Sequence, residues 1–153
     1  SSLGVVNDGK GLDYFIPEST SLSAFTLPQQ YVVYALGAQH NTKKLPLTKQ
    51  IELCNSIPNT VVLIGGKEDM EAGEQLSSAC SNALNLCGQL SIDQSALLMK
   101  GAEKIYSHDT GMMHIAAALS NQSSLSGAIP FQNLACTHTI LPTLMTLKIR
   151  CWK

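Results

Sequence analysis

Charged residues are scarce in this sequence, and long apolar runs are absent. Only 14% of its 153 residues are charged, and ten Lys and Arg face eleven Asp and Glu, which leaves a net charge of -1. A chain without a basic surface does not attract a polyphosphate backbone, so we expect no nucleic-acid partner. The longest apolar runs, 61–64 and 115–119, are far shorter than the ~20 residues of a membrane span. At most a peripheral membrane contact is expected.

Paired cysteines are missing as well. The five Cys form no CxxC pair and have no His beside them at ligand spacing, which disfavours a zinc site and a disulfide framework. We predict that Cys54 and Cys87 are small buried hydrophobes, in keeping with a reducing compartment and a cytoplasmic location. The first residues show no secretion signal. Because the chain starts at Ser1 without Met, we expect it to be part of a longer protein.

The apolar fraction of 44% is enough for one sizeable core, and the length suits a single domain. Residues 1–30 are rich in Ser, Gly and Pro and are interpreted as a linker or arm. Short apolar, often β-branched runs then predict four strands, at 31–36, 60–64, 84–86 and 103–107.

Apolar residues at helical spacing separate these strands. Thr48 is predicted to cap the first helix, Ser91 and Gln94 to form a capping box for a third that ends at Gly101, and Asp109 to cap a fourth. The inner faces of the first three helices are predicted to carry Ile51 and Cys54, then Met70, Gly73, Leu76 and Cys80, and then Ile92, Ala96 and Met99. This alternation predicts a Rossmann-like α/β domain over 31–119, a parallel sheet flanked by helices.

In open α/β sheets, ligands bind outside the carboxyl ends of the strands. After the last predicted strand, Asp109, Thr110 and Gly111 open a helix whose first N–H groups are unpaired and attract a phosphate. Gly111 permits close approach to the backbone, and His114, one turn further, could donate to a phosphate oxygen. The alternative is that Asp109 is only a cap and that His114 packs against the sheet.

Two further loops carry groups that suit a nucleotide. After the first strand, Lys43 or Lys44 could neutralise a diphosphate, unless both are ordinary solvated lysines. The Gly-Gly turn at 65–66 suits backbone approach, and Glu68 or Glu71 beyond it could accept from ribose hydroxyls, unless these acids only stabilise the start of a helix. The sequence has neither a GxGxxG motif nor an arguable Ser/His/Asp triad.

Three segments of the chain match, in the same order, the sequence pattern of a known family: GAQHNTKKLPLTKQIELC, VVLIGGKEDMEAGEQL, and NLCGQLSIDQSALLMKGAEKIYSHDTGMMHIAAAL. They resemble glycosyltransferase family 9, the lipopolysaccharide heptosyltransferases, over about 4–119. The most specific piece is the DTGxxHxAAA signature at 109–118. Residues 7–17, NDGKGLDYFIP, are similar to the arm of a Bacteroidetes-type branch. The resemblance implies the C-terminal, donor-binding half of a two-domain GT-B fold.

The resemblance also implies a role for each loop around an ADP-heptose-like donor. Lys43 would neutralise the phosphates and Asp109 would contact the sugar, both as catalytic residues. Thr110, Gly111 and His114 would hold the diphosphate, and Glu68 or Glu71 would face the ribose. Leu45 stands where family members usually have Trp, so stacking at that position is not expected.

Inverting transfer is the implied reaction. A base on the N-terminal half would deprotonate a hydroxyl of the lipopolysaccharide core acceptor, which attacks the anomeric carbon. The leaving nucleoside diphosphate gains negative charge, which Lys43 and the helix start at Thr110 would stabilise without a metal or other cofactor. This chain alone is expected to be inactive. The alternatives are a non-catalytic nucleotide-binding or interaction module and a hydrolase that uses His114.

Residues 120–153 depart from the family pattern, which continues with a Pro-led strand and a Trp-Gly turn. Codons for 126–142 can be chosen so that another reading frame gives a family-like sequence that begins with Trp-Gly. We therefore hypothesise a frameshift at about Ser120, which would make 120–153 an atypical tail and remove the next parallel strand.

Overall fold

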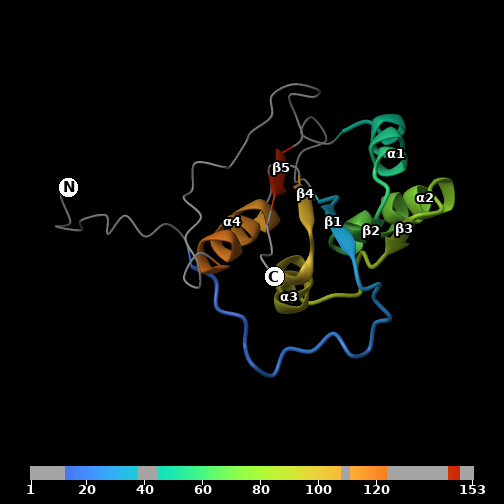
Figure 1. Ribbon diagram of the computed structural model, residues 1–153. Coiled ribbons are helices and arrows are strands. Elements are labelled where there is room, and N and C mark those ends of the chain that lie inside the picture. Colours follow the sequence, from blue (N-terminus) through green and yellow to red (C-terminus); the bar gives the residue numbers. More distant parts are fainter. Residues whose placement is uncertain (1–12, 38–44, 108–110, 124–144, 149–153) are drawn as a thin grey trace, which may run out of the picture.

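A computed structural model describes residues 13–37, 45–107, 111–123 and 145–148 (Figure 1). Strands and helices alternate through most of the chain, as predicted. In chain order the elements are β1 (Tyr31–Ala35), α1 (Leu47–Ser56), β2 (Thr60–Ile64), a 3-10 turn η2 (Lys67–Asp69), α2 (Met70–Ala79), β3 (Ala83–Asn85), α3 (Ile92–Gly101), β4 (Lys104–Ser107), α4 (Gly111–Ser123) and β5 (Met145–Lys148).

The five strands form one sheet in the order β3-β2-β1-β4-β5. The first four are parallel, with Val33 of β1 beside Val62 of β2 on one side and Ile105 of β4 on the other. β5 pairs antiparallel with β4. The predicted Rossmann-like parallel sheet flanked by helices is therefore confirmed.

Both faces of the sheet are covered by helices. Side chains alternate between the faces of a strand, so one face of β1 and β2 packs against α3 and α4 while the other packs against α1 and α2. Figure 1 shows α1 and α2 on one side of the sheet and α4 on the other. Because β1 and β2 are buried on both faces, these two central strands are apolar throughout rather than alternating. The buried residues toward α3 and α4 include Val33, Ala35, Val62 and Ile64, and those toward α1 and α2 include Val32, Tyr34, Val61 and Leu63.

The capping predictions had mixed outcomes. Ser91 and Gln94 do form the predicted capping box of α3, with Gln94 N donating to Ser91 Oγ at 3.1 Å and Ser91 N donating to Gln94 Oε1 at 3.0 Å. The prediction that Thr48 caps α1 is wrong, because Pro46 occupies the N-cap and the helix begins at Leu47. The proline ring fixes a φ of -54°, so the chain enters the helix before Thr48 is reached.

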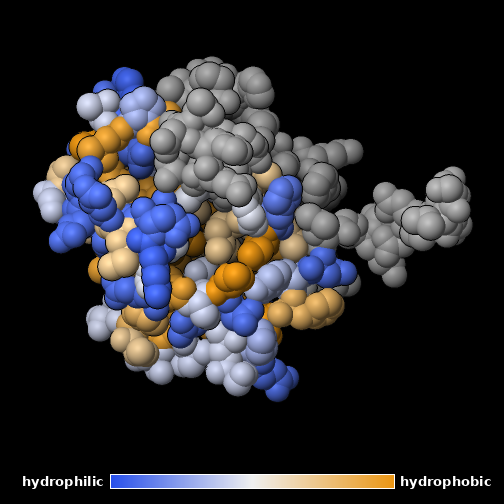
Figure 2. Space-filling view, turned by 180° about the vertical axis from the view of Figure 1, so that it is seen from behind, coloured by the Kyte–Doolittle hydropathy of each residue, from blue (hydrophilic) through white to orange (hydrophobic). Residues whose placement is uncertain are grey.

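Two predicted core residues are instead exposed. Met70 is 48% exposed and Ile92 60% exposed, so the prediction that they lie on the inner faces of their helices is wrong. Each is the first residue of its helix, as is the exposed Leu47. A helix between parallel strands runs back against the sheet, so its first residue lies beyond the carboxyl ends of the strands and has no sheet to cover it. Seen from behind, hydrophobic side chains show at several places between hydrophilic ones (Figure 2).

Residues 13–30 contain no helix or strand, but they lie against the domain. The Tyr14 hydroxyl donates to Asp93 Oδ1 at 2.7 Å, and this hydrogen bond is the main reason why the pKa of Tyr14 is raised. Gln94 Nε2 donates to the carbonyl of Ser21 at 3.1 Å. Figure 1 shows this segment passing below α3 on its way to β1. Its partly buried apolar residues against the core are Tyr14, Ile16, Leu22, Phe25 and Leu27.

The chain after α4 differs from a continued parallel sheet. β5 comes from this part of the sequence and places Met145 beside Ser107 in the antiparallel register. Residues 124–144 and 149–153 lie outside the described part, and the frameshift hypothesis stays a prediction. Within the described ranges, no helix is long and apolar enough to cross a membrane.

Candidate functional site

The strand order places a topological switch point at β1. From β1 the chain moves outward through β2 to β3, and it then returns to add β4 on the other side of β1. At their carboxyl ends, Ala35 of β1 lies beside Ser107 of β4. In open α/β sheets a ligand binds in the crevice outside the strands at such a reversal. The edge between β1 and β4 is thus the candidate site.

Two loops predicted to bind the donor leave from these neighbouring strands. The loop after β1 runs from Leu36 to Pro46, and the loop after β4 comprises residues 108–110. Lys43 and Lys44 of the first loop, and Asp109 and Thr110 of the second, lie outside the described residues. Leu45 is buried and accepts a hydrogen bond from the Gln50 side-chain amide through its carbonyl.

The start of α4 has room beside its backbone. Among the described residues, a Cβ atom built on Gly111 would have no heavy atom within 4 Å, apart from its chain neighbours and its own helix backbone. Gly111 is exposed, and His114, one turn along the same helix, is exposed too. The alternative in which His114 packs against the sheet is therefore wrong. This is the amino end of a 13-residue helix, where the first N–H groups have no partner within the helix and the helix dipole is positive.

The Gly65–Gly66 turn after β2 is held by an aspartate that the sequence analysis did not single out. Asp69 is 1% exposed, and its Oδ2 accepts from Gly66 N at 3.1 Å. Asp69 N in turn donates to the carbonyl of Gly66 at 3.1 Å. The only sequence signal was the spacing of an acid three residues after a Gly-Gly turn.

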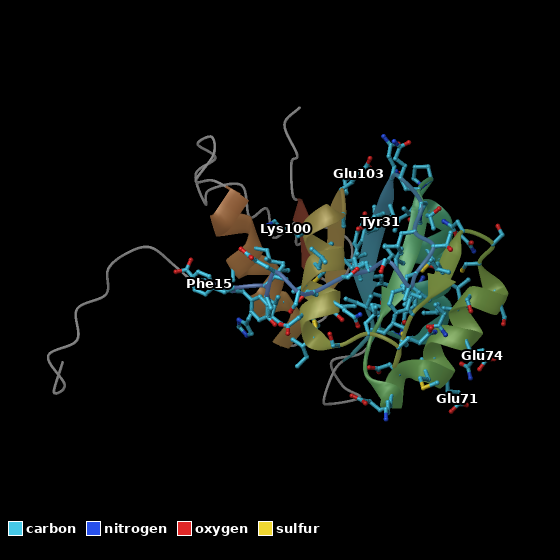
Figure 3. All side chains as sticks on the ribbon, turned by 90° about the horizontal axis from the view of Figure 1, so that it is seen from below. Phe15, Tyr31, Glu71, Glu74, Lys100 and Glu103 are labelled. Carbon is cyan, nitrogen blue, oxygen red and sulfur yellow. The ribbon has the colours of Figure 1, made fainter. Side chains whose placement is uncertain are left out.

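The two candidate ribose acids differ in position. The Glu68 carboxylate lies where a Cβ on Gly66 would be, so it folds over the turn. Glu71 lies on the first turn of α2, and its Oε1 accepts from Gln75 Nε2 at 3.5 Å. Figure 3 shows Glu71 and Glu74 projecting outward from α2. Both Glu68 and Glu71 are exposed, and Glu68 is closer to the glycine turn.

Met70 and Gly88 add an apolar surface next to this turn. Gly88 has a φ of 71°, and its N–H donates to the carbonyl of Gly65 at 2.9 Å. A Cβ on Gly88 would lie 2.8 Å from Met70 Sδ. The half-exposed thioether therefore lies directly over bare backbone, and such a surface suits the face of a flat aromatic ring. Periodicity had assigned Met70 to the core.

The described cysteines are not reactive groups. Burial raises the pKa of the Cys87 thiol to about 12, with a smaller contribution from the negative charge of Asp69. Burial, and then the neighbouring Cys80, raise the pKa of Cys54 to about 12. All three are free thiols, and the prediction that Cys54 and Cys87 are buried is confirmed. Within the described ranges, no three His, Cys, Asp or Glu residues come together as a metal site.

Comparison with known proteins agrees with this arrangement. The model of glycosyltransferase family 9 (heptosyltransferase) matches residues 17–123. Since this match covers more than half of the chain, the chain belongs to glycosyltransferase family 9, the heptosyltransferases. The match ends at the last residue of α4.

Individual relatives are lipopolysaccharide heptosyltransferases. Lipopolysaccharide heptosyltransferase 2 of Salmonella typhimurium is 30% identical over 113 residues, which cover 67% of this chain and 32% of the relative. The structure of E. coli ADP-heptose lps heptosyltransferase II is similar with a TM-score of 0.56 and 29% identity, over 60% of this chain and 30% of that one. The crystal structure of a family 9 glycosyl transferase from Veillonella parvula has a TM-score of 0.64 at 18% identity, over 77% and 38% of the two chains, and it supports the fold alone.

The chain matches about a third of the length of these relatives. The activity of the complete relatives therefore cannot be assigned directly to this chain. The fold, by contrast, is that of the heptosyltransferase structures, a four-stranded parallel sheet flanked by helices.

Proposed function

We propose that this chain is the C-terminal, donor-binding half of an inverting heptosyltransferase of lipopolysaccharide core synthesis, of the Bacteroidetes-type branch. The donor is an ADP-heptose-like nucleotide sugar. The observation that carries the proposal is the reversal of strand order between Ala35 and Ser107, next to the open helix start at Gly111. A diphosphate at that point meets free N–H groups and a helix dipole.

The proposed contacts follow the donor from its base to its sugar. The base lies on Met70 and Gly88, and Glu68 or Glu71 accepts from the ribose. Lys43, Thr110, Gly111 and His114 hold the diphosphate, and Asp109 contacts the sugar. Gly88 N donates to the carbonyl of Gly65 at 2.9 Å, so the proposed base position lies next to the Gly65–Gly66 turn. This proximity favours the order of base, ribose and diphosphate along the site.

In the proposed reaction, the residues of this chain act mainly on the leaving nucleoside diphosphate. An acceptor hydroxyl, deprotonated by a base on the other half of the enzyme, attacks the anomeric carbon, and the bond to the diphosphate breaks. The departing nucleoside diphosphate gains negative charge. Lys43 and the first N–H groups of α4 stabilise that charge by electrostatic attraction. Cation and helix dipole supply this stabilisation, so the proposal needs no metal.

The acceptor, a lipopolysaccharide core, is held by the N-terminal half in this proposal. This chain alone then binds the donor without turning it over. A cytoplasmic location, with at most peripheral membrane contact, is part of the proposal and is favoured by the three free buried thiols at Cys54, Cys80 and Cys87.

Calorimetric titration of the chain with ADP, and then with an ADP-sugar, tests the proposal. We expect saturable binding that is weakened about tenfold or more in Lys43→Ala and in Asp109→Ala, because each variant loses a charged contact to the ligand. Lys100→Ala and Glu74→Ala are matched controls. Lys100 is in the last turn of α3, toward the amino ends of the strands, and Glu74 projects outward from α2 (Figure 3).

Three outcomes contradict the proposal in different ways. No binding of ADP favours a non-catalytic interaction module. Equal losses in the control variants indicate a nonspecific charge effect. Release of ADP or phosphate from the ADP-sugar by this chain alone, abolished in His114→Ala, indicates a hydrolase.

A further inference from the structure

Asp69 is the only carboxylate that is buried among the residues the structure describes. A buried carboxylate is costly unless hydrogen bonds compensate for the water it loses. It lies at the end of η2, directly before α2, on the carboxyl side of β2. This places it at the candidate site, although no ligand contact of the proposed function uses it.

The Asp69 side chain touches the ends of two adjacent strands. After β2, its Oδ2 accepts from Gly66 N at 3.1 Å, and a Cβ on Gly65 would lie 2.8 Å from Asp69 Cβ. After β1, a Cβ on Gly37 would lie 3.1 Å from Asp69 Oδ2. Both glycines therefore leave the space that the carboxylate occupies. A side chain at Gly65 would force the aspartate to move.

Residues that follow a third strand, β3, also lie near Asp69. The negative charge of Asp69 contributes, after burial, to the raised pKa of the Cys87 thiol just after β3. Gly88 N donates to the carbonyl of Gly65 at 2.9 Å, which ties the β3 end to the glycine turn. The carboxylate thus lies near residues that follow β1, β2 and β3, namely Gly37, Gly65 and Cys87.

We propose that Asp69 is a positioning residue for the nucleotide site. Its carboxylate fixes the Gly65–Gly66 turn and the start of the β1 loop at Gly37 in the arrangement that receives a nucleoside diphosphate. This inference rests on the proposed function, because it presupposes that a nucleoside diphosphate binds at this edge.

Asp69→Ala and Asp69→Asn test the inference, with Glu74→Ala and Glu74→Gln as controls. Glu74 is an exposed carboxylate on the same helix. Each pair removes one negative charge, so only the buried contact distinguishes them. Two quantities are measured well below the unfolding temperature of each variant: amide hydrogen exchange of Gly66 in a chain labelled with ¹⁵N-glycine, and the Kd for ADP by calorimetry.

In Asp69→Ala we expect exchange at Gly66 to accelerate and the Kd for ADP to rise, each about tenfold, because a hydrogen bond to a charged acceptor is lost. Asp69→Asn retains one acceptor oxygen and the shape but loses the charge, so both quantities should rise about threefold, less than in Asp69→Ala but more than in the controls. Both controls should match the unsubstituted chain. A purely structural role predicts a lower unfolding temperature with no change in the Kd of the folded variant.

The inference is overturned if folded Asp69→Ala binds ADP like the Glu74 controls or leaves Gly66 exchange unchanged. If Asp69→Ala does not fold, Asp69→Asn decides, and values equal to Glu74→Gln overturn the inference. Failure of the unsubstituted chain to bind ADP contradicts the proposed function itself. Binding that survives the loss of Asp69 contradicts this inference alone.

Discussion

Ala35 and Ser107 lie side by side at the carboxyl ends of β1 and β4. They are 72 residues apart in the sequence, yet they anchor the two loops that carry the predicted cationic and phosphate-binding groups. Neighbouring parallel strands send their following loops to the same edge of a sheet. A ligand at this edge can therefore contact both loops at once. The predictions below test that edge and the packing that supports it.

Gly111→Ala should separate binding from folding. The methyl group meets no atom of the described residues within 4 Å, so the free energy of unfolding should stay the same or rise by up to about 1 kcal/mol. The same methyl occupies the space proposed for the diphosphate, and we expect the Kd for ADP to rise about tenfold. Urea unfolding and calorimetry measure the two effects. Unchanged ADP affinity would place the diphosphate elsewhere.

Gly73→Ala, unlike Gly111→Ala, should lower the free energy of unfolding. Gly73 is buried in α2, and a Cβ there would overlap the Asn85 side-chain amide, whose Oδ1 accepts from Cys87 N at 3.0 Å. Overpacking costs about 1–3 kcal/mol and outweighs the gain of about 1 kcal/mol in helix propensity. We expect a lower urea midpoint than in Gly111→Ala. A midpoint equal to or above that of the unsubstituted chain refutes this account of the α2 and β3 packing.

Met70→Ala should weaken nucleotide binding without destabilising the fold. Met70 is 48% exposed, so the free energy of unfolding should change by less than about 0.5 kcal/mol. Loss of its apolar contact with the base should raise the Kd for ADP about fivefold. Ile92→Ala is the matched control, because Ile92 is also an exposed first residue of a helix. An equal rise in both variants argues against a base at Met70.

The buried thiols predict a stability change at alkaline pH. The pKa of Cys87 rises from 9.0 to about 12 on folding, so the folded state favours the neutral thiol. This contribution is fully present below pH 9 and is lost as the pH rises from 9 toward 12. The urea midpoint should therefore fall more steeply between pH 9 and about 12 in the unsubstituted chain than in Cys87→Ala, which lacks this titration. Parallel pH profiles would contradict the raised pKa.

Local sequence signals were enough to predict most of the fold. β2 occupies the predicted 60–64, and α3 has the predicted capping box and ends at Gly101. These features depend on residues close together in the chain, such as Ser91 with Gln94. The strand pattern was also informative, because strands covered on both faces must be apolar throughout.

The errors and omissions depend on contacts between distant residues. Met70 and Ile92 have the periodicity of buried positions, but periodicity does not show that the sheet ends before them. Asp69 looks like an ordinary acid near a helix start. Its burial becomes visible only when Gly37 and Gly65, from two different strand ends, are brought against it. Sequence reasoning indicated the edge of the candidate site but did not single out the buried carboxylate of Asp69.

The central claim is that a nucleoside diphosphate binds outside the carboxyl ends of β1 and β4. The most direct test is to follow the glycine amides by NMR while ADP is added to the ¹⁵N-glycine-labelled chain. The account predicts the largest shift changes at Gly37, Gly65, Gly66 and Gly111, with little change at Gly101, which ends α3 at the opposite edge beside Tyr31. Changes centred on Gly101, or no change at Gly111 under saturating ADP, would contradict it.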